Sequence, residues 1–232
     1  MIYLDNAATT IMREEVLAAM LPYMREQFAN PAAAYRSAKA VRDSVEHARF
    51  QCASLINASA SAHKLGGPKG VGLLYVRPGL KLPPLLFGGA QEKGLRAGTT
   101  NTAGIIGFGM AAELAKRDMA KNTEKVSALR NRLIERVLTE NPGAKLNGHP
   151  ANRLPGNASF TFEDINGEEL LMLLDAAGIC ASTGSACSAG NGEPSCTSCN
   201  GTDSRRGTGV SQAYSVGRYN IRGNRTNSRY AF

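Results

Sequence analysis

Apolar residues recur at helical spacing in two stretches near the start of the chain. Residues 13–28 carry such a stripe with acids near its beginning, which predicts an amphipathic helix. Residues 34–56 predict a second helix, and its apolar or small residues share one face: Val41, Val45, Ala48, Cys52 and Leu55. Asn30-Pro31 separates the two, because the residue before a proline is disfavoured in helical conformation.

Later segments continue the alternation of helices and short strands. Residues 102–138 predict helix, in one piece or in two around Lys121-Asn122, and residues 168–177 predict a helix closed by Gly178. Three segments predict strands or extended chain: the opening run Leu4–Thr10 as a strand and turn, Val71–Val76 as a buried strand, and Ala158–Phe162 as an alternating strand. This order of elements indicates an α/β chain.

Composition narrows the class of protein. The 232 residues are 43% hydrophobic and 20% charged, which is typical of a globular chain and excludes collagen, a coiled coil and a wholly disordered chain. No apolar run reaches the length of a bilayer span, so we expect a soluble, cytoplasmic protein without a membrane partner. Five cysteines are too few for a disulfide scaffold and indicate reduced thiols, one of them a candidate nucleophile.

The net charge of +8 is concentrated at one end. Residues 201–232 hold six arginines and one acid, a pattern that can indicate contact with nucleic acid. Cys196 and Cys199 form a CxxC just before this tail, so a metal- or nucleic-acid-binding module is one alternative. A structural zinc site needs a second pair of ligands, and the remaining cysteines lack that spacing.

Three segments carry candidate chemistry. Lys64 follows His63 in a turn of small residues, where a lysine held close to a ligand can form a Schiff base; from spacing alone, a solvated loop lysine is the simpler interpretation. Cys187 lies among small polar residues that cannot bury it, which favours a nucleophile, whereas Cys52 and Cys180 have apolar neighbours typical of a core. Gly98-Thr99-Thr100 precedes a predicted helix and is either an anion cradle or a plain helix cap.

Together these segments resemble the NifS/IscS-type cysteine desulfurases, pyridoxal-phosphate enzymes of the class-V aminotransferase family. The matching pieces stand in the family's order over most of residues 1–194: Tyr3–Thr10, Ser61–Lys64 with Gly67–Gly72, Gly88–Thr99 and Thr183–Cys187. The resemblance implies an α/β, fold-type-I PLP-transferase-like fold with a truncated large-domain sheet and a smaller α+β domain. It divides the chain into residues 1–95 as the remnant of the large domain, 96–195 as the small domain, and 196–232 as an aberrant basic tail.

The resemblance also implies roles for five residues. Lys64 would form the Schiff base with pyridoxal 5'-phosphate, and Ser61 and His63 would hold the phosphate of that cofactor. Thr99 would reach the phosphate bound by the neighbouring subunit of a homodimer. Cys187 would take sulfur from L-cysteine as a persulfide, leave L-alanine, and pass the sulfur to an acceptor or iron-sulfur scaffold protein.

The sequence departs from the family pattern in two places, a missing internal stretch and the tail after Ser195. Both departures support an alternative, an inactive remnant that cannot hold the cofactor. Between Ser59 and Ser61 the family has a long stretch that this chain lacks, which carries the histidine stacked on the cofactor ring and the aspartate that pairs with its nitrogen. The family's arginine for the substrate carboxylate would fall at Ala213. Several central strands would be lost as well, which would open the edges of the sheet.

The second departure begins after Ser195. Residues 196–201 can be written as TGT ACT TCT TGC AAT GGG, and one base later this reads Val-Leu-Leu-Ala-Met, as in the family's helix. We therefore hypothesise that residues 196–216 and 221–232 are translated out of frame. The CxxC and the basic tail would then be accidents of the frame, which argues against a nucleic-acid partner.

Overall fold

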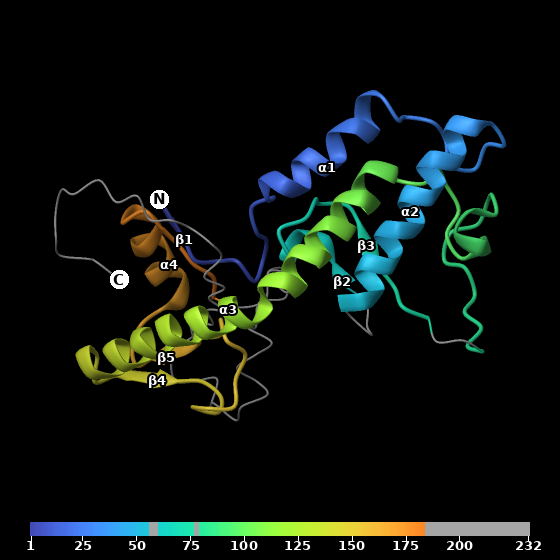
Figure 1. The fold of residues 1–232 in the computed structure, drawn as a ribbon. Coiled ribbons are helices and arrows are strands. Elements are labelled where there is room, and N and C mark those ends of the chain that lie inside the picture. Colours follow the sequence, from blue (N-terminus) through green and yellow to red (C-terminus); the bar gives the residue numbers. More distant parts are fainter. Residues whose placement is uncertain (56–59, 77–78, 184–232) are drawn as a thin grey trace. The chain divides into compact units, whose positions relative to one another are not determined.

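The structure, a computed structural model, describes residues 1–55, 60–76 and 79–183. The chain packs as two compact units. One comprises residues 10–118, and the other comprises residues 1–9 with the described part of residues 119–232. Figure 1 shows the order of the elements along the chain.

Among the described residues, the α-helices of the unit of residues 10–118 are α1 (Glu14–Arg25), α2 (Arg36–Leu55) and the first part of α3 (Thr102–Glu140) (Figure 1). Two clusters of buried residues form its core: Val16, Met20, Ala111 and Leu114 in one, and Cys52, Ala62, Phe108 and Ala112 in the other. The helices approach closely where small residues meet, since a Cβ on Gly109 would lie 2.7 Å from the Cα of Ala48. This approach gives a dense core from small side chains.

The sequence pattern predicted these helices well. Helix α2 buries the predicted face through Val41, Val45, Ala48 and Cys52. Helix α1 ends at Arg25 and buries only Val16 and Met20. Met24, which follows Val16 and Met20 at helical spacing, is 59% exposed in the last turn. Helix α3 continues unbroken through Lys121-Asn122, so it forms one piece.

A short hairpin follows α2. Strand β2 (Ala60–Ser61) pairs antiparallel with β3 (Gly72–Leu73), and a single 3-10 turn, Ala62–Lys64, begins the connection between them. The strand expected over residues 71–76 is therefore confirmed only at Gly72–Leu73, and its expected burial is wrong. Leu74 is 64% exposed, because among the described residues β3 pairs with β2 alone and no larger sheet covers it.

The second unit joins both ends of the described chain. Strand β1 (Ile2–Tyr3) runs parallel to β6 (Ile179–Cys180), and β4 (Ala144–Leu146) runs antiparallel to β5 (Phe160–Phe162). Helix α4 (Gly167–Ala176) begins at Asn166, whose side chain accepts a hydrogen bond from the backbone N–H of Glu168. The strand predicted over residues 158–162 and the helix predicted over residues 168–177 are confirmed by β5 and α4, and the left-handed Gly178 follows the helix as expected. The strand predicted in the opening run Leu4–Thr10 instead lies just before it, at Ile2–Tyr3.

Within the described residues the strands form three separate pairs, which agrees with a truncated sheet. The units divide between residues 118 and 119, whereas the resemblance placed a domain boundary between residues 95 and 96. The difference arises because the first turns of α3 pack on α1 and α2, through Phe108, Ala111 and Ala112. In the described part of the chain, no helix is long and apolar enough to cross a membrane.

Candidate functional site

The turn that carries Lys64 is rooted in the core of its unit. Ala62 is fully buried, and Leu65 packs against both core clusters. Lys64 itself is exposed, and His63 is half-buried. Backbone N–H groups of Leu65 and Gly67 both donate to the carbonyl oxygen of Ala62, at 2.9 and 3.0 Å. The turn therefore presents the lysine amine outward from a fixed base.

Thr10 ties this turn to the start of the chain. Its backbone N–H and its hydroxyl both donate to the carbonyl oxygen of His63, at 2.9 and 2.7 Å. The same hydroxyl oxygen accepts a hydrogen bond from the backbone N–H of Gly66 at 2.8 Å. One side chain thus bridges two backbone groups that flank Lys64 and Leu65.

Arg13 makes a second connection to the turn. Its backbone N–H donates to the carbonyl oxygen of Gly66 at 3.0 Å, and its guanidinium pairs with Asp118 of α3 at 3.2 Å. Gly66 has a φ of 78°, and a Cβ there would lie 2.9 Å from the Cγ of Arg13. A side chain at position 66 would therefore meet both backbone strain and the arginine stem.

Thr99 lies exposed on a separate segment that precedes α3. The side chain of Arg96 donates to the carbonyl oxygens of Gly98 and Thr99, each at 3.2 Å, and the side chain of Gln91 accepts from the N–H of Gly98 at 3.1 Å. The side chain of Asn101 accepts from the N–H of Gly104 and so caps α3. Because Asn101 is the cap, the Gly98-Thr99-Thr100 segment is not needed for that purpose.

An ion pair anchors this segment to α2. Two nitrogens of Arg49 donate to the two carboxylate oxygens of Glu92, each at 2.8 Å. This pairing raises the pKa of the Arg49 guanidinium, against the opposing effect of burial. Glu92 and Lys93 have left-handed backbone, with φ of 51° and 56°. Since such backbone is costly for residues with side chains, the ion pair offsets strain in the turn.

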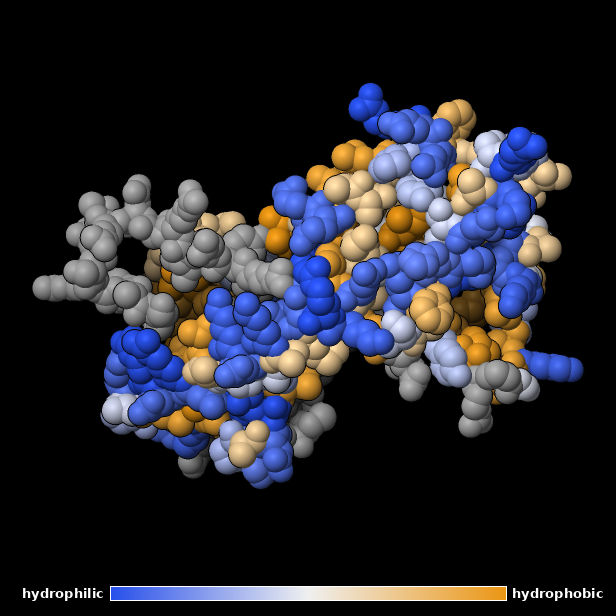
Figure 2. All heavy atoms as spheres, in the orientation of Figure 1, coloured by the Kyte–Doolittle hydropathy of each residue, from blue (hydrophilic) through white to orange (hydrophobic). Residues whose placement is uncertain are grey.

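The segment before this turn carries apolar side chains at the surface. Leu85 is 90% exposed, Phe87 is 87% exposed and Leu86 is 55% exposed. Apolar residues reach the surface of the molecule in several places in Figure 2. A consecutive apolar run with this degree of exposure is typical of a surface that another protein covers.

Two of the five cysteines, Cys52 and Cys180, lie in the described part of the chain. Cys52 is free and buried, and burial raises the pKa of its thiol to about 11, which makes it a poor nucleophile. Cys180 is free and half-buried in β6. The expected core position is therefore confirmed for Cys52 and only partly reached by Cys180. Cys187, Cys196 and Cys199 lie outside the described residues.

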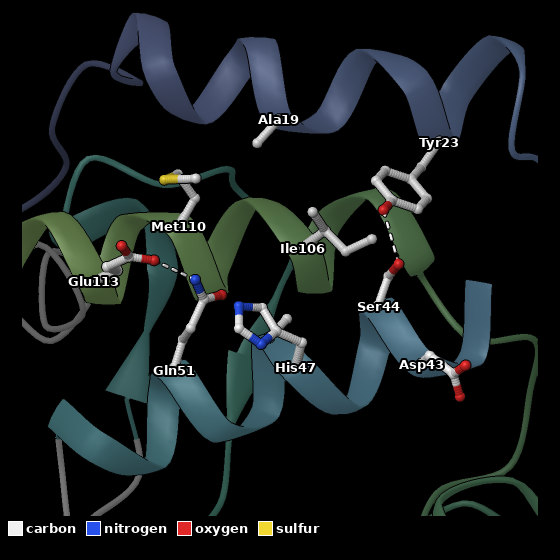
Figure 3. Close-up of a pocket in the computed structure, with 10 residues that line it drawn as sticks. Ala19, Tyr23, Asp43, Ser44, His47, Gln51, Ile106, Met110 and Glu113 are labelled. Atoms are coloured by element: carbon white, nitrogen blue, oxygen red, sulfur yellow. Dashed lines mark hydrogen bonds between the residues drawn. The ribbon is translucent and has the colours of Figure 1, made fainter. Parts of the chain in front are cut away.

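A cavity of about 480 Å³ lies among α1, α2 and α3, away from the lysine turn. Figure 3 shows its polar side chains, which largely pair with one another. The hydroxyl of Tyr23 donates to Ser44 at 2.8 Å, and Gln51 donates to the carboxylate of Glu113. No predicted site residue lines this cavity. In the described ranges, no group of three or more His, Cys, Asp and Glu side chains is placed to hold a metal.

The structure thus brings His63 and Lys64 together on one hairpin with the backbone of Ser61, and places Thr99 on a second segment of the same unit. Sequence reasoning missed Thr10, Arg13 and Asp118 as supports of the lysine turn. Thr10 belongs to the family-like motif at the start of the chain, so the motif was a signal for it. Arg13 and Asp118 are 105 positions apart, and no sequence pattern indicated their pairing.

Comparisons with known proteins agree with the sequence motifs. The sequence model of the family described as Aminotransferase class-V matches residues 2–61 and 58–220. The chain is 53% identical over 137 residues to the cysteine desulfurase IscS of Methanosarcina thermophila and 52% identical over 137 residues to the cysteine desulfurase NifS of Azotobacter vinelandii. Each alignment covers 59% of this chain and 34% of the relative. The chain therefore spans about a third of the length of the curated relatives it matches.

Solved structures share the fold. A NifS-like protein superposes with a TM-score of 0.74 at 21% identity over 78% of this chain and 87% of its own. A structure titled SspA in complex with cysteine gives a TM-score of 0.69 at 20% identity over 92% of this chain and 99% of its own. These likenesses confirm the expected α/β, fold-type-I class.

Proposed function

The chain belongs to the class-V aminotransferase family, and on that premise we propose that it acts as a cysteine desulfurase. The reaction removes sulfur from L-cysteine, gives L-alanine and leaves a persulfide on Cys187. The observation that carries this proposal is the lysine turn. Lys64 stands exposed on a hairpin whose base is buried and hydrogen-bonded, in a chain that is 53% and 52% identical over 137 residues to two named cysteine desulfurases.

The residues present fit pyridoxal phosphate at its aldehyde end. Lys64 offers a primary amine in solvent reach, and we propose that the imidazole of the half-buried His63 beside it binds a phosphate oxygen. We propose that Ser61 contributes its hydroxyl to the same phosphate. Thr99 would serve the phosphate held by a second copy. When bound, pyridoxal phosphate supplies the electron sink for the bonds broken in the substrate.

The chain's own residues would then divide the work. Lys64 would hold the cofactor and would carry protons at its Nζ atom while the substrate is bound. The thiolate of Cys187 attacks the sulfur of the bound cysteine, so that an S–S bond forms and the C–S bond breaks. The substrate carbon left by the sulfur takes up a proton, which yields alanine and the Cys187 persulfide. The persulfide sulfur is then available to an acceptor or iron-sulfur scaffold protein in the cytoplasm.

The exposed apolar run supports a homodimer as the working form. Leu85 and Phe87 lie on the same segment as Thr99, the residue that we assign to the neighbouring subunit. If a second copy covers this run, Thr99 of one copy would lie near the cofactor that is bound to Lys64 of the other copy. Sedimentation of the native chain and of Phe87→Asp tests this point: the native chain should form dimers, and the variant should be monomeric.

One observation favours the alternative, an inactive remnant of the family. The two segments matched by the family model meet at residues 58–61, as expected for a chain that lacks the intervening stretch. The groups that the family uses around the cofactor ring belong to that stretch. The remnant would keep Lys64 but fail to retain the cofactor.

A labelling experiment separates the two. The purified chain is incubated with pyridoxal phosphate, its visible absorbance is recorded, and the adduct is reduced with borohydride and mapped. We expect a yellow product labelled on Lys64 and lost in Lys64→Ala, whereas Lys69→Ala, which removes another exposed lysine of the same loop, should keep it. Label scattered over surface lysines would support the remnant. Release of alanine from cysteine, abolished in Cys187→Ser, then tests the complete reaction.

A further inference from the structure

We propose that Thr10 is a positioning residue for Lys64, and that its hydroxyl sets the geometry in which the lysine amine meets the cofactor. This inference rests on the proposed function, since it assigns a role within the same site. The contacts that carry it join two segments 53 positions apart in the sequence.

The hydroxyl of Thr10 is fully used by the lysine turn. It donates to the carbonyl oxygen of His63 at 2.7 Å and accepts from the N–H of Gly66 at 2.8 Å. These two groups lie on either side of Lys64, so the hydroxyl closes the turn as a bridge. A hydroxyl that donates once and accepts once in this way fixes the distance between its two partners.

The backbone bond of Thr10 cannot replace this bridge. The N–H of Thr10 also donates to the carbonyl of His63, at 2.9 Å, and this bond remains in any variant that keeps the backbone. The N–H of Gly66 has the Thr10 hydroxyl as its partner, and Gly66 is itself buried. Loss of the hydroxyl would therefore leave a buried donor unsatisfied, which the turn can relieve only by opening toward water.

The other contacts of the turn hold Ala62, Leu65 and Gly66, which form its base, rather than the segment with His63 and Lys64. Ala62 and Leu65 pack in the core, and Arg13 binds the carbonyl of Gly66. With the hydroxyl removed, this base should stay folded while the segment with His63 and Lys64 gains freedom. The expected result is a lysine that is still exposed but no longer held in one orientation.

The test compares Thr10→Val, which keeps the shape of the side chain, with Thr10→Ser, which keeps the hydroxyl. For each variant we measure the apparent Kd for pyridoxal phosphate by visible absorbance, and the ratio of borohydride-trapped label on Lys64 to label on Lys69. Thr10→Val should weaken binding and lower the ratio by about 3- to 10-fold, the range expected for one lost hydrogen bond. Thr10→Ser should remain within about twofold of the native chain, because its hydroxyl can make the same two bonds.

A matched variant distinguishes positioning from general destabilisation. Val45 is a buried residue of α2 in the same unit, and we assign it no part in holding the turn. Val45→Ala should therefore lower the stability of the unit without removing a hydrogen bond of the turn. It should leave the label ratio unchanged. A ratio in Thr10→Val equal to that of the native chain would overturn the inference and leave the proposed function standing. If the native chain itself takes no label on Lys64, the proposed function fails, independently of Thr10.

Discussion

The lysine turn and the segment of residues 80–99 belong to the same unit of the chain, yet the two are held very differently. The turn places Ala62 in the core and makes hydrogen bonds to Thr10 and Arg13. The other segment leaves Leu85 and Phe87 almost fully exposed and is anchored by the ion pair of Glu92 with Arg49.

The two segments therefore differ in whether their own chain supplies the contacts that hold them. The lysine turn is complete within one chain, because the partners of its backbone are supplied by the same unit. The segment with Thr99 exposes apolar side chains that no other described part of the chain covers. If Thr99 serves the cofactor of a second copy, as we propose, this segment is the part of the site that would need that copy.

The largest expected difference between the two regions is in the stability lost when one large side chain of each is truncated to alanine. Met20 is 6% exposed and belongs to the cluster beneath the turn, so Met20→Ala should lower the free energy of unfolding by about 2–5 kcal/mol. Phe87→Ala should lower it by less than about 0.5 kcal/mol in a monomer, because that ring is already in water. Urea unfolding at low protein concentration measures both. Equal losses would mean that the two regions are packed alike.

A pH series examines the core behind the turn. Burial raises the pKa of the Cys52 thiol from 9.0 to about 11. Below pH 9 the thiol is protonated in both the folded and unfolded chain, and its contribution to stability is fully present. As the pH rises toward 11, the unfolded chain loses the proton first, so stability should fall by about 2–3 kcal/mol.

Urea unfolding at several pH values between 8.5 and 11 measures this loss. The Cys52→Ala variant is the control, because it retains every other group that titrates in this range. The native chain should lose more stability than the variant over the series. Parallel curves for the two proteins would show that Cys52 is not buried in this way.

The smallest effect is expected at the anchor of the exposed segment. Glu92→Gln removes the charge that pairs with Arg49, and both side chains are partly exposed, so the loss in stability should be about 0.5–1 kcal/mol. Limited proteolysis within residues 80–99 should become faster. Glu46→Gln is a matched control, since Glu46 contacts the same arginine at 3.3 Å from a more exposed position and should change neither quantity measurably.

The helices and the chemical segments were predictable from the sequence because their signals are local. The buried face of α2 follows from helical spacing, and the position of Lys64 follows from a contiguous motif. The connections between distant segments were not predictable. Thr10 and His63, Arg13 and Asp118, and Arg49 and Glu92 each meet only when the fold is formed.

The buried strand expected over residues 71–76 was confirmed at two residues only, for a related reason. Its apolar sequence is typical of a strand buried in a sheet, but β3 is two residues long and pairs only with β2 in the described part of the chain. The apolar sequence of residues 71–76 suits a strand that is buried in the larger sheet of the family fold. The strands that would bury this segment were inferred to be missing, and its exposure is consistent with that inference.

Amide hydrogen exchange with peptide resolution tests the contrast between the two segments most directly. The N–H groups of Leu65, Gly66 and Gly67 all donate hydrogen bonds within the turn or to Thr10, so they should exchange only when the unit of residues 10–118 unfolds. Peptides that cover residues 79–90 should exchange close to the rate of an unfolded chain at low protein concentration. Exchange in the lysine turn as fast as in residues 79–90 would contradict the claim that this chain alone forms the turn.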